Sequence, residues 1–246
     1  MKYWTFFLGM ILALMLPFAA FGNNRVEWSY DGHLGPETWG NLDPAFRMCS
    51  EGTQQSPVDL SSAVETELFD VKIEWTQAEW MVENTGRTIS MMSEAAGHAI
   101  IDDQRYDLIG IEFRNPSEHQ IDGLGFPMEV QFKHRHENGS LAVIAVVVRG
   151  GGSNSAFDAL IGVAPIEDGD ESNLSDFNPS FMITDIGDIL RYQGSLTMPP
   201  CSENVLWTVL MDPLVVSDAA LLAFNSLFAL NARPLQPLNR RYILTD

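Results

Sequence analysis

One segment constrains the fold of this chain more than any other: the eight consecutive apolar residues 141–148, Leu-Ala-Val-Ile-Ala-Val-Val-Val. An unbroken apolar run of this length suits a strand that is buried on both faces of a sheet. Residues 128–134 and 111–114 instead alternate apolar and polar side chains, so each would present one face of each kind, because alternate residues share a strand face. Residues 205–211 are a further strand candidate. The sequence therefore predicts a mostly β protein.

Helical signals are confined to the edges of this pattern. Near the C-terminus, Ser217 and Asp218 are suited to cap a helix over residues 219–230, where apolar residues recur at helical spacing. The length of 246 residues fits one or two domains. Because the chain has neither an internal repeat nor a long linker rich in Pro, Ser or Gly, nothing in the sequence separates two domains.

The N-terminus has the pattern of a secretory signal peptide. Lys2 is followed by an uncharged apolar run over residues 5–20, and Ala20-Phe21-Gly22 forms a small-x-small cleavage pattern. The alternative is a retained membrane anchor, but the run is short for a span of about 20 residues. We therefore expect a signal peptide at residues 1–22 and an exported mature chain, periplasmic or extracellular, without stable membrane insertion.

The two cysteines, Cys49 and Cys201, form an even pair in a chain predicted to be exported, so a disulfide is the natural interpretation. The alternative is a catalytic or metal-binding thiol, which neither a nearby CxxC motif nor a neighbouring histidine supports. The formal net charge of −19 disfavours a nucleic-acid partner, because neutralising phosphates requires clustered Lys and Arg.

Several separate motifs together resemble the α-class carbonic anhydrases. They occur in the family's order and cover nearly the whole mature chain. They are Trp28-Ser29-Tyr30, Gly35-Pro36-Glu37-Thr38-Trp39-Gly40, Gln55-Ser56-Pro57-Val58-Asp59, Pro116-Ser117-Glu118-His119, the segment from Gly194-Ser195-Leu196-Thr197 through Pro199-Pro200-Cys201-Ser202-Glu203, Trp207, and the segment 233–239.

The resemblance implies a single domain over residues 23–246. Its fold would be mostly β with a minor α component: a large twisted, mainly antiparallel central sheet with short peripheral helices. It also implies that Cys49 and Cys201 pair, as in exported members, and that a conical cleft holds zinc, whose bound hydroxide hydrates carbon dioxide. The expected cleft residues are Lys133, Val143, Leu196, Met198, Val205 and Trp207.

The chain departs from the family at the metal. The positions that correspond to the three zinc histidines hold Glu112, Arg114 and Gln131. A guanidinium stays protonated and offers no lone pair, so Arg114 cannot ligate zinc. We therefore expect neither a metal site nor another cofactor. A new site at His134 and His136 is an alternative to a structural role for these two histidines.

The residues around the metal position are retained in part. Thr197 and Glu118 match the threonine that orients zinc hydroxide and its carboxylate partner, and Glu129 matches the residue that orients the third zinc histidine. These three are expected to persist as hydrogen-bonded framework. The position of the proton-shuttle histidine holds Arg87, which does not titrate near neutral pH.

Our physical hypothesis is that Arg114 takes the place of the zinc cation and forms a salt-bridged network with Glu112 and Glu129. Lys133 should enter the same cleft floor, because buried charges are tolerated only when they are paired. A second hypothesis is that Arg114, Lys133 and Arg87 bind a small anion such as a carboxylate.

The expected function is an inactive, metal-free binding or scaffold domain for an unknown protein or a small-anion ligand. The alternative is an enzyme. It would be either a residual carbon dioxide hydratase with an unorthodox site or a metal-free hydrolase that uses Thr197 and Glu118.

Overall fold

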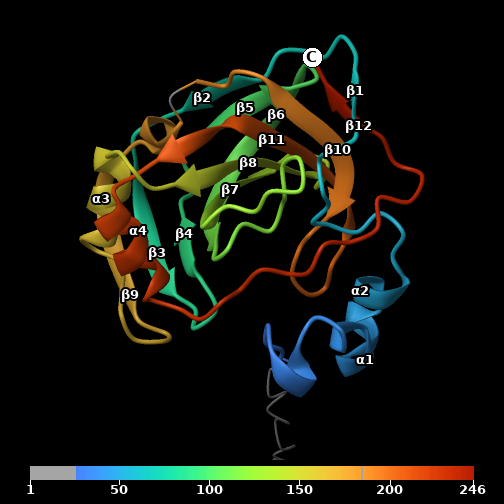
Figure 1. Ribbon diagram of the computed structural model, residues 1–246. Helices are drawn as coiled ribbons and strands as arrows, with labels where there is room; N and C mark the ends of the chain where they lie inside the picture. Colours follow the sequence, from blue (N-terminus) through green and yellow to red (C-terminus); the bar gives the residue numbers. More distant parts are fainter. Residues whose placement is uncertain (1–25, 184) are drawn as a thin grey trace, which may run out of the picture.

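Twelve strands of the described chain form one twisted sheet (Figure 1). The computed structural model describes residues 26–183 and 185–246, so the predicted signal peptide lies outside the described residues. The strands are β1 (Ala63–Glu65), β2 (Lys72–Trp75), β3 (Ala78–Asn84), β4 (Ile89–Met92), β5 (Gly97–Ile101), β6 (Gln104–Arg114), β7 (Met128–Arg135), β8 (Leu141–Arg149), β9 (Glu171–Phe177), β10 (Ile189–Ser195), β11 (Glu203–Val215) and β12 (Ile243–Thr245).

The sheet runs in the order β1-β12-β10-β11-β8-β7-β6-β4-β3-β9, with β5 beside β6 and β2 beside β5. Its ladders are antiparallel except for β8 with β11 and β1 with β12. The expected mostly β fold with a mainly antiparallel sheet is therefore confirmed. Strand β8 lies between β7 and β11, and residues 142–148 are all buried, as the unbroken apolar run predicts.

The alternation along β7 sorts its side chains onto two different faces. Met128, Val130 and Phe132 enter the larger hydrophobic cluster of the protein. Because successive side chains point to opposite faces, the polar residues between them lie on the other side of the sheet. There they face a smaller apolar cluster that includes Val143 and Trp207. The polar half of the alternation thus marks the face on which the candidate site is built.

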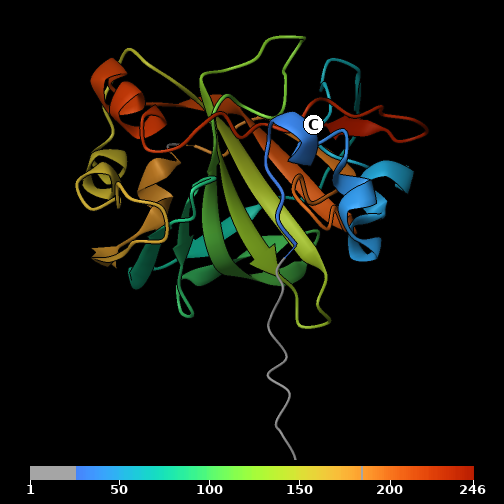
Figure 2. The same cartoon turned by 90° about the horizontal axis from the view of Figure 1, so that it is seen from below.

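Short helices lie at the periphery, with α3 and α4 on one flank and α1 and α2 on the opposite flank (Figures 1 and 2). They are α1 (Trp39–Leu42), α2 (Met48–Glu51), α3 (Ser155–Ile161) and α4 (Asp218–Asn225), with 3-10 turns η1 (Gly32–Leu34), η2 (Pro44–Phe46) and η3 (Pro179–Met182). None of these helices has both the length and the apolar character needed to cross a bilayer, within the part of the chain that the structure describes.

Helix α4 is shorter than the sequence predicts. Its cap is as expected, because the Ser217 hydroxyl oxygen accepts a hydrogen bond from the Ala220 amide at 3.0 Å. The helix ends at Asn225 rather than Leu230. Ser226 turns its hydroxyl onto the Ala223 carbonyl at 2.7 Å, and such side-chain bonds compete with helix continuation. Leu230 is exposed, so a longer helix would gain no apolar burial there.

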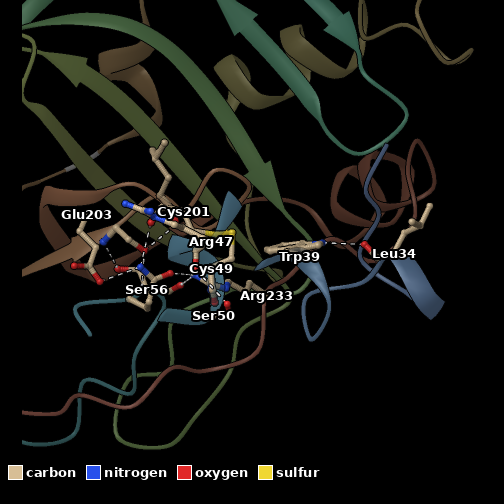
Figure 3. Close-up of a disulfide and its surroundings, with 12 residues drawn as sticks. Leu34, Trp39, Arg47, Cys49, Ser50, Ser56, Cys201, Glu203 and Arg233 are labelled. Carbon is tan, nitrogen blue, oxygen red and sulfur yellow. Dashed lines mark hydrogen bonds between the residues drawn. A yellow bond between two sulfur atoms is a disulfide. The ribbon is translucent and has the colours of Figure 1, made fainter. Parts of the chain in front are cut away.

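The disulfide joins Cys49 of α2 to Cys201 in the segment between β10 and β11, which confirms the expected pair (Figure 3). The Arg233 guanidinium donates to the Cys49 carbonyl at 2.9 Å. The Cys201 amide donates to the Met198 carbonyl, also at 2.9 Å. These contacts fix the loop that carries Thr197 and Met198 over the polar face of the sheet.

Candidate functional site

A cavity of about 230 Å³ lies over the polar face of β6 and β7. Its lining is Glu112, Arg114, Gln131, Lys133, Val143, Leu196, Thr197, Met198, Pro199 and Trp207. Of the expected cleft residues, only Val205 is absent from this lining. It is buried in the smaller apolar cluster, to which Val143 and Trp207 also belong.

The register of β6 and β7 brings the three candidate zinc-ligand positions together. Glu112 and Gln131 are direct cross-strand partners, and Arg114 lies two residues beyond Glu112 on the same face. Side chains of directly opposite residues start about 5 Å apart, so all three reach one floor. The arrangement needed for three converging ligands is thus present in the backbone, while the side chains are of other types.

Arg114 forms the centre of this floor and is 1% exposed. Its Nη2 donates to Glu112 Oε2 at 2.7 Å, and its Nε donates to Glu118 Oε2 at 3.1 Å. The expected ion pair with Glu112 is confirmed. The expected pair with Glu129 is wrong, because the second carboxylate that Arg114 meets is that of Glu118, four residues further along the chain.

Glu112 is bound by two cations. Its other oxygen, Oε1, accepts a hydrogen bond from Lys133 Nζ. Burial alone would raise the pKa of Glu112, but the charges of Lys133 and Arg114 outweigh burial and hold that pKa at about 2. Glu112 is therefore an ionised carboxylate at neutral pH, neutralised inside the cavity wall.

Glu118 lies behind Arg114 and accepts from several donors. Besides Arg114, Gln131 Nε2 donates to Oε2 at 2.8 Å and the Arg233 amide donates to Oε1 at 2.9 Å. Burial raises the pKa of Glu118 above its ordinary value, and the Arg114 charge offsets only part of that effect. Thr197 also offsets part of this rise in the pKa of Glu118.

Glu129 is fully buried and joins this floor to His119, because Gln131 Nε2 donates to it at 2.9 Å as well as to Glu118. Its Oε2 accepts from the amides of Glu118 and His119 at 3.1 and 2.9 Å, and its Oε1 lies 3.0 Å from His119 Nδ1. Burial would raise the pKa of Glu129, but the bonds and charge from His119 lower it. His119 Nε2 lies 2.6 Å from the Tyr192 hydroxyl, so these groups tie β7 to β10.

The alternative histidine site does not form. His134 is buried, and its Nε2 accepts a hydrogen bond from the Trp75 indole at 3.0 Å, which occupies the lone pair a metal would need. His136 lies instead against the Tyr106 ring, with 5.4 Å between the ring centroids. Burial lowers the pKa of His134 to about 3, so it stays neutral at ordinary pH.

Arg87, at the expected shuttle position, lies outside the cavity lining. Its Nε donates to the Trp28 carbonyl at 3.1 Å, and its guanidinium lies 4.4 Å from the centre of the Trp28 ring. Arg87 therefore does not contribute to the anion site of our second hypothesis, because its side chain is bound to Trp28 in the N-terminal segment.

The side chains of the floor do not match what zinc requires. Protein zinc sites use His, Cys, Asp or Glu donors, and Arg114 has no lone pair to offer. The Glu112 carboxylate is already bound by two cations. Gln131 is a weak metal ligand, and its amide nitrogen donates hydrogen bonds to Glu118 and Glu129. Within residues 26–183 and 185–246, no group of three or more His, Cys, Asp and Glu is placed to hold a metal ion.

Three contributors to the site were not predicted from the sequence. Pro199 lines the cavity, the Arg233 amide binds Glu118, and Tyr30 lies close enough for the charge of Arg114 to act on its hydroxyl. All three lie inside motifs that carry the family resemblance. Their positions within these motifs are the sequence signal that could have identified Tyr30, Pro199 and Arg233 as site residues.

Comparison with known proteins agrees with the fold and the motifs. The sequence model of the family described as eukaryotic-type carbonic anhydrase matches residues 34–246. A carbonic anhydrase of Neisseria gonorrhoeae is 35% identical over 237 residues, which cover 96% of this chain and 94% of that protein.

Solved structures give the same result. The α-carbonic anhydrase of Thermovibrio ammonificans, solved with the inhibitor sulfanilamide, is 35% identical with a TM-score of 0.87, covering 89% of this chain and 99% of that one. A dioscorin solved in complex with ascorbate is 29% identical with a TM-score of 0.83, covering 89% of this chain and 97% of that one.

Proposed function

The chain belongs to the eukaryotic-type carbonic anhydrase family, and from this membership we propose that it is a metal-free member that does not hydrate carbon dioxide. It acts instead as an exported binding or scaffold domain. One observation carries the proposal: Arg114 lies buried between Glu112 and Glu118 at the floor where the family's zinc would be held.

The charge balance of the floor supports this proposal. Arg114 and Lys133 together neutralise Glu112 and Glu118, so the floor is a closed set of ion pairs. A divalent cation entering this set would meet a buried guanidinium of like charge. The family's reaction needs a bound metal to lower the pKa of a water molecule and make hydroxide, and a floor occupied by Arg114 offers no ligand set for that metal.

An enzyme that works through Thr197 and Glu118 is disfavoured by the same contacts. A general base needs a free lone pair directed at the proton it removes. Both oxygens of Glu118 already accept hydrogen bonds, from Arg114 and Gln131 on one oxygen and from the Arg233 amide on the other. Glu118 therefore already accepts three hydrogen bonds and its charge is paired with that of Arg114, which leaves little capacity for it to act as a base.

A small anion is the second candidate, as the ligand of the binding domain. Lys133 favours it, because its side chain is 27% exposed where it lines the cavity. The dioscorin relative solved with ascorbate shows that a protein of this fold has been obtained with a small organic acid. Calorimetric titration with bicarbonate, acetate and phosphate tests the idea. Heat that disappears in Lys133→Met supports it, and no heat from any of the three anions ends it.

The proposal is tested by stopped-flow carbon dioxide hydration, with metal analysis of the purified chain. The Neisseria gonorrhoeae relative, assayed in parallel, serves as the positive control. We expect the uncatalysed rate and no stoichiometric metal in the wild-type protein. Hydration above background together with about one zinc per chain would overturn the proposal. Hydration without metal would instead favour the unorthodox enzyme.

The cellular location belongs to the same proposal. The disulfide is compatible with export, because such bonds persist in oxidising compartments. Fractionation of the native host checks this point. A mature chain found in the periplasm or medium agrees with export, and a chain found in the cytosol with reduced cysteines contradicts it.

A further inference from the structure

The lining of the Arg114 cavity contains one hydrogen-bond donor with unused capacity. The Lys133 ammonium carries three N–H bonds, and within the described chain its hydrogen bond to Glu112 uses one of them. The Lys133 side chain lines the cavity and is 27% exposed, so the remaining N–H bonds can reach a bound molecule. Lys133 can therefore donate to a ligand without giving up its ion pair.

Gln131 supplies an acceptor beside this donor. Both hydrogens of its amide are engaged, because Nε2 donates to Glu118 and to Glu129 at 2.8 and 2.9 Å. A flipped amide would direct its oxygen at two carboxyl groups, so these contacts fix which way the amide points. The oxygen, Oε1, makes no hydrogen bond with the described residues, yet it is not one of the fully enclosed atoms that lack a partner. It is therefore open to the cavity that Gln131 lines.

The strand register brings the donor and the acceptor together. Gln131 and Lys133 are alternate residues of β7, so their side chains share one face. Glu112 is the direct cross-strand partner of Gln131. Because Lys133 Nζ is bonded to Glu112, the ammonium is drawn along the strand toward the Gln131 amide. The floor thus presents a donor beside an acceptor, which is the complement of a carboxamide group with its acceptor oxygen and donor nitrogen.

An apolar wall begins directly beside Lys133. Val143 of β8 is the cross-strand partner of Lys133, and Trp207 of β11 is in turn the partner of Val143. Strands β7, β8 and β11 lie side by side in the sheet, so these side chains share the face of the cavity (Figure 1). Leu196 also lines the cavity. A ligand whose polar group lies over β7 can therefore extend an apolar body over β8 and β11.

The charges of the floor favour an uncharged ligand. Its two cations and two carboxylates balance one another, so an anion would find no uncompensated positive charge there. Burying an ion without a partner of opposite charge is costly. A carboxylate also has acceptor oxygens alone, and one of them would face the acceptor oxygen of Gln131.

We propose that this cavity binds a small uncharged molecule in which a flat apolar body carries one carboxamide group. The carboxamide oxygen accepts from Lys133, its nitrogen donates to Gln131 Oε1, and the apolar body packs against Val143 and Trp207. The cavity volume of about 230 Å³ lies below the roughly 300–1,000 Å³ of pockets for drug-sized molecules, so the ligand is small. The proposal rests on the binding function proposed above, and its ligand differs in charge from the small-anion candidate.

The test is calorimetric titration of the purified chain with two molecules of the same shape, benzamide and benzoate. They share the ring and differ in the charge and donor capacity of the polar group. We expect benzamide to bind at one saturable site, at least tenfold more tightly than benzoate and than acetamide, which lacks the ring. No saturable binding of benzamide would overturn the proposal, and so would an equal or higher affinity for benzoate or acetamide.

Two variants test the two halves of the site. Lys133→Met removes the donor and should weaken benzamide binding about tenfold or more. Lys72→Met is the matched control, because it removes an exposed lysine of β2 and should leave the affinity unchanged. Leu196→Ala shortens the apolar wall without removing a charge, which covers the case in which the Lys133 variant does not fold, and it should weaken benzamide binding severalfold. Unchanged affinity in Lys133→Met or in Leu196→Ala, or an equal loss in Lys72→Met, would overturn the proposal.

The ligand class and the proposed function fail in different ways. Zinc-dependent hydration of carbon dioxide would overturn the metal-free function whatever benzamide does. Absence of benzamide binding in a chain that has neither zinc nor hydration activity would overturn the ligand class alone.

Discussion

Replacing Arg114 with Met should expose how far the folded state depends on the buried charge network. Arg114 is almost fully buried, as are Glu112 and Glu118, so solvent screens their attraction very little. Removing one partner of a buried ion pair typically costs about 3–5 kcal/mol of unfolding free energy, because the remaining charge is left uncompensated. Glu112 keeps Lys133, so the loss falls mainly on Glu118. For a chain of this size the melting temperature should fall by about 6–20 °C.

The pH dependence distinguishes lost charge pairing from lost packing. Without Arg114, the folded-state pKa of both Glu112 and Glu118 should rise. A carboxyl group whose pKa is higher in the folded state than in the unfolded state favours folding as it takes up a proton. The stability deficit of Arg114→Met relative to the wild type should therefore shrink between pH 8 and pH 5.

The assay is urea denaturation of the wild type and the variant at both pH values, followed by tryptophan fluorescence. Arg105→Met is the matched control. Its arginine also pairs with a carboxylate, that of Asp107, but both side chains are more than half exposed. Such a pair should contribute less than about 1 kcal/mol. An Arg114→Met loss no larger than that of the control, or an equal loss at pH 5 and pH 8, would refute the reasoning.

Three further predictions concern stability. The double variant C49S/C201S opens a loop with a sequence separation of 152 residues, so it should lose about 5 kcal/mol by chain entropy, measured by urea denaturation. The folded pKa of Glu112, about 2, lies below its unfolded value of 4.5, so stability present above pH 4.5 should be lost as the pH falls toward 2. The loss should amount to about 3 kcal/mol, and acid titrations of Glu112→Gln should lack this component. The folded pKa of His134, about 3, lies below its unfolded value of 6.5, so acid should destabilise the wild type between these values. His134→Gln should weaken that dependence, and an unchanged acid profile would contradict the burial of a neutral imidazole.

Periodicity explains why much of the fold and the site floor could be predicted from the sequence. The apolar run of β8 and the alternation of β7 each have a single arrangement that buries their apolar side chains. The same two-residue period placed Glu112 and Arg114 on one face. The end of α4 was missed because local side-chain bonds, and not the apolar pattern, terminate that helix.

The partner of Arg114 could not be obtained from strand periodicity. The partner depends on how the segment after β6 folds back. That segment carries Glu118 to the Arg114 guanidinium, and it places His119 against Glu129 of β7.

The central claim is that the Arg114 network stands where the family's zinc ligands would converge. Its most direct test is zinc binding at equilibrium, measured by dialysis and metal analysis on the wild type and on the triple variant E112H/R114H/Q131H. The register of β6 and β7 places these three positions together, and three histidines are an established catalytic zinc ligand set. We predict about one zinc per chain in the triple variant and none in the wild type. One zinc bound per wild-type chain would contradict the account.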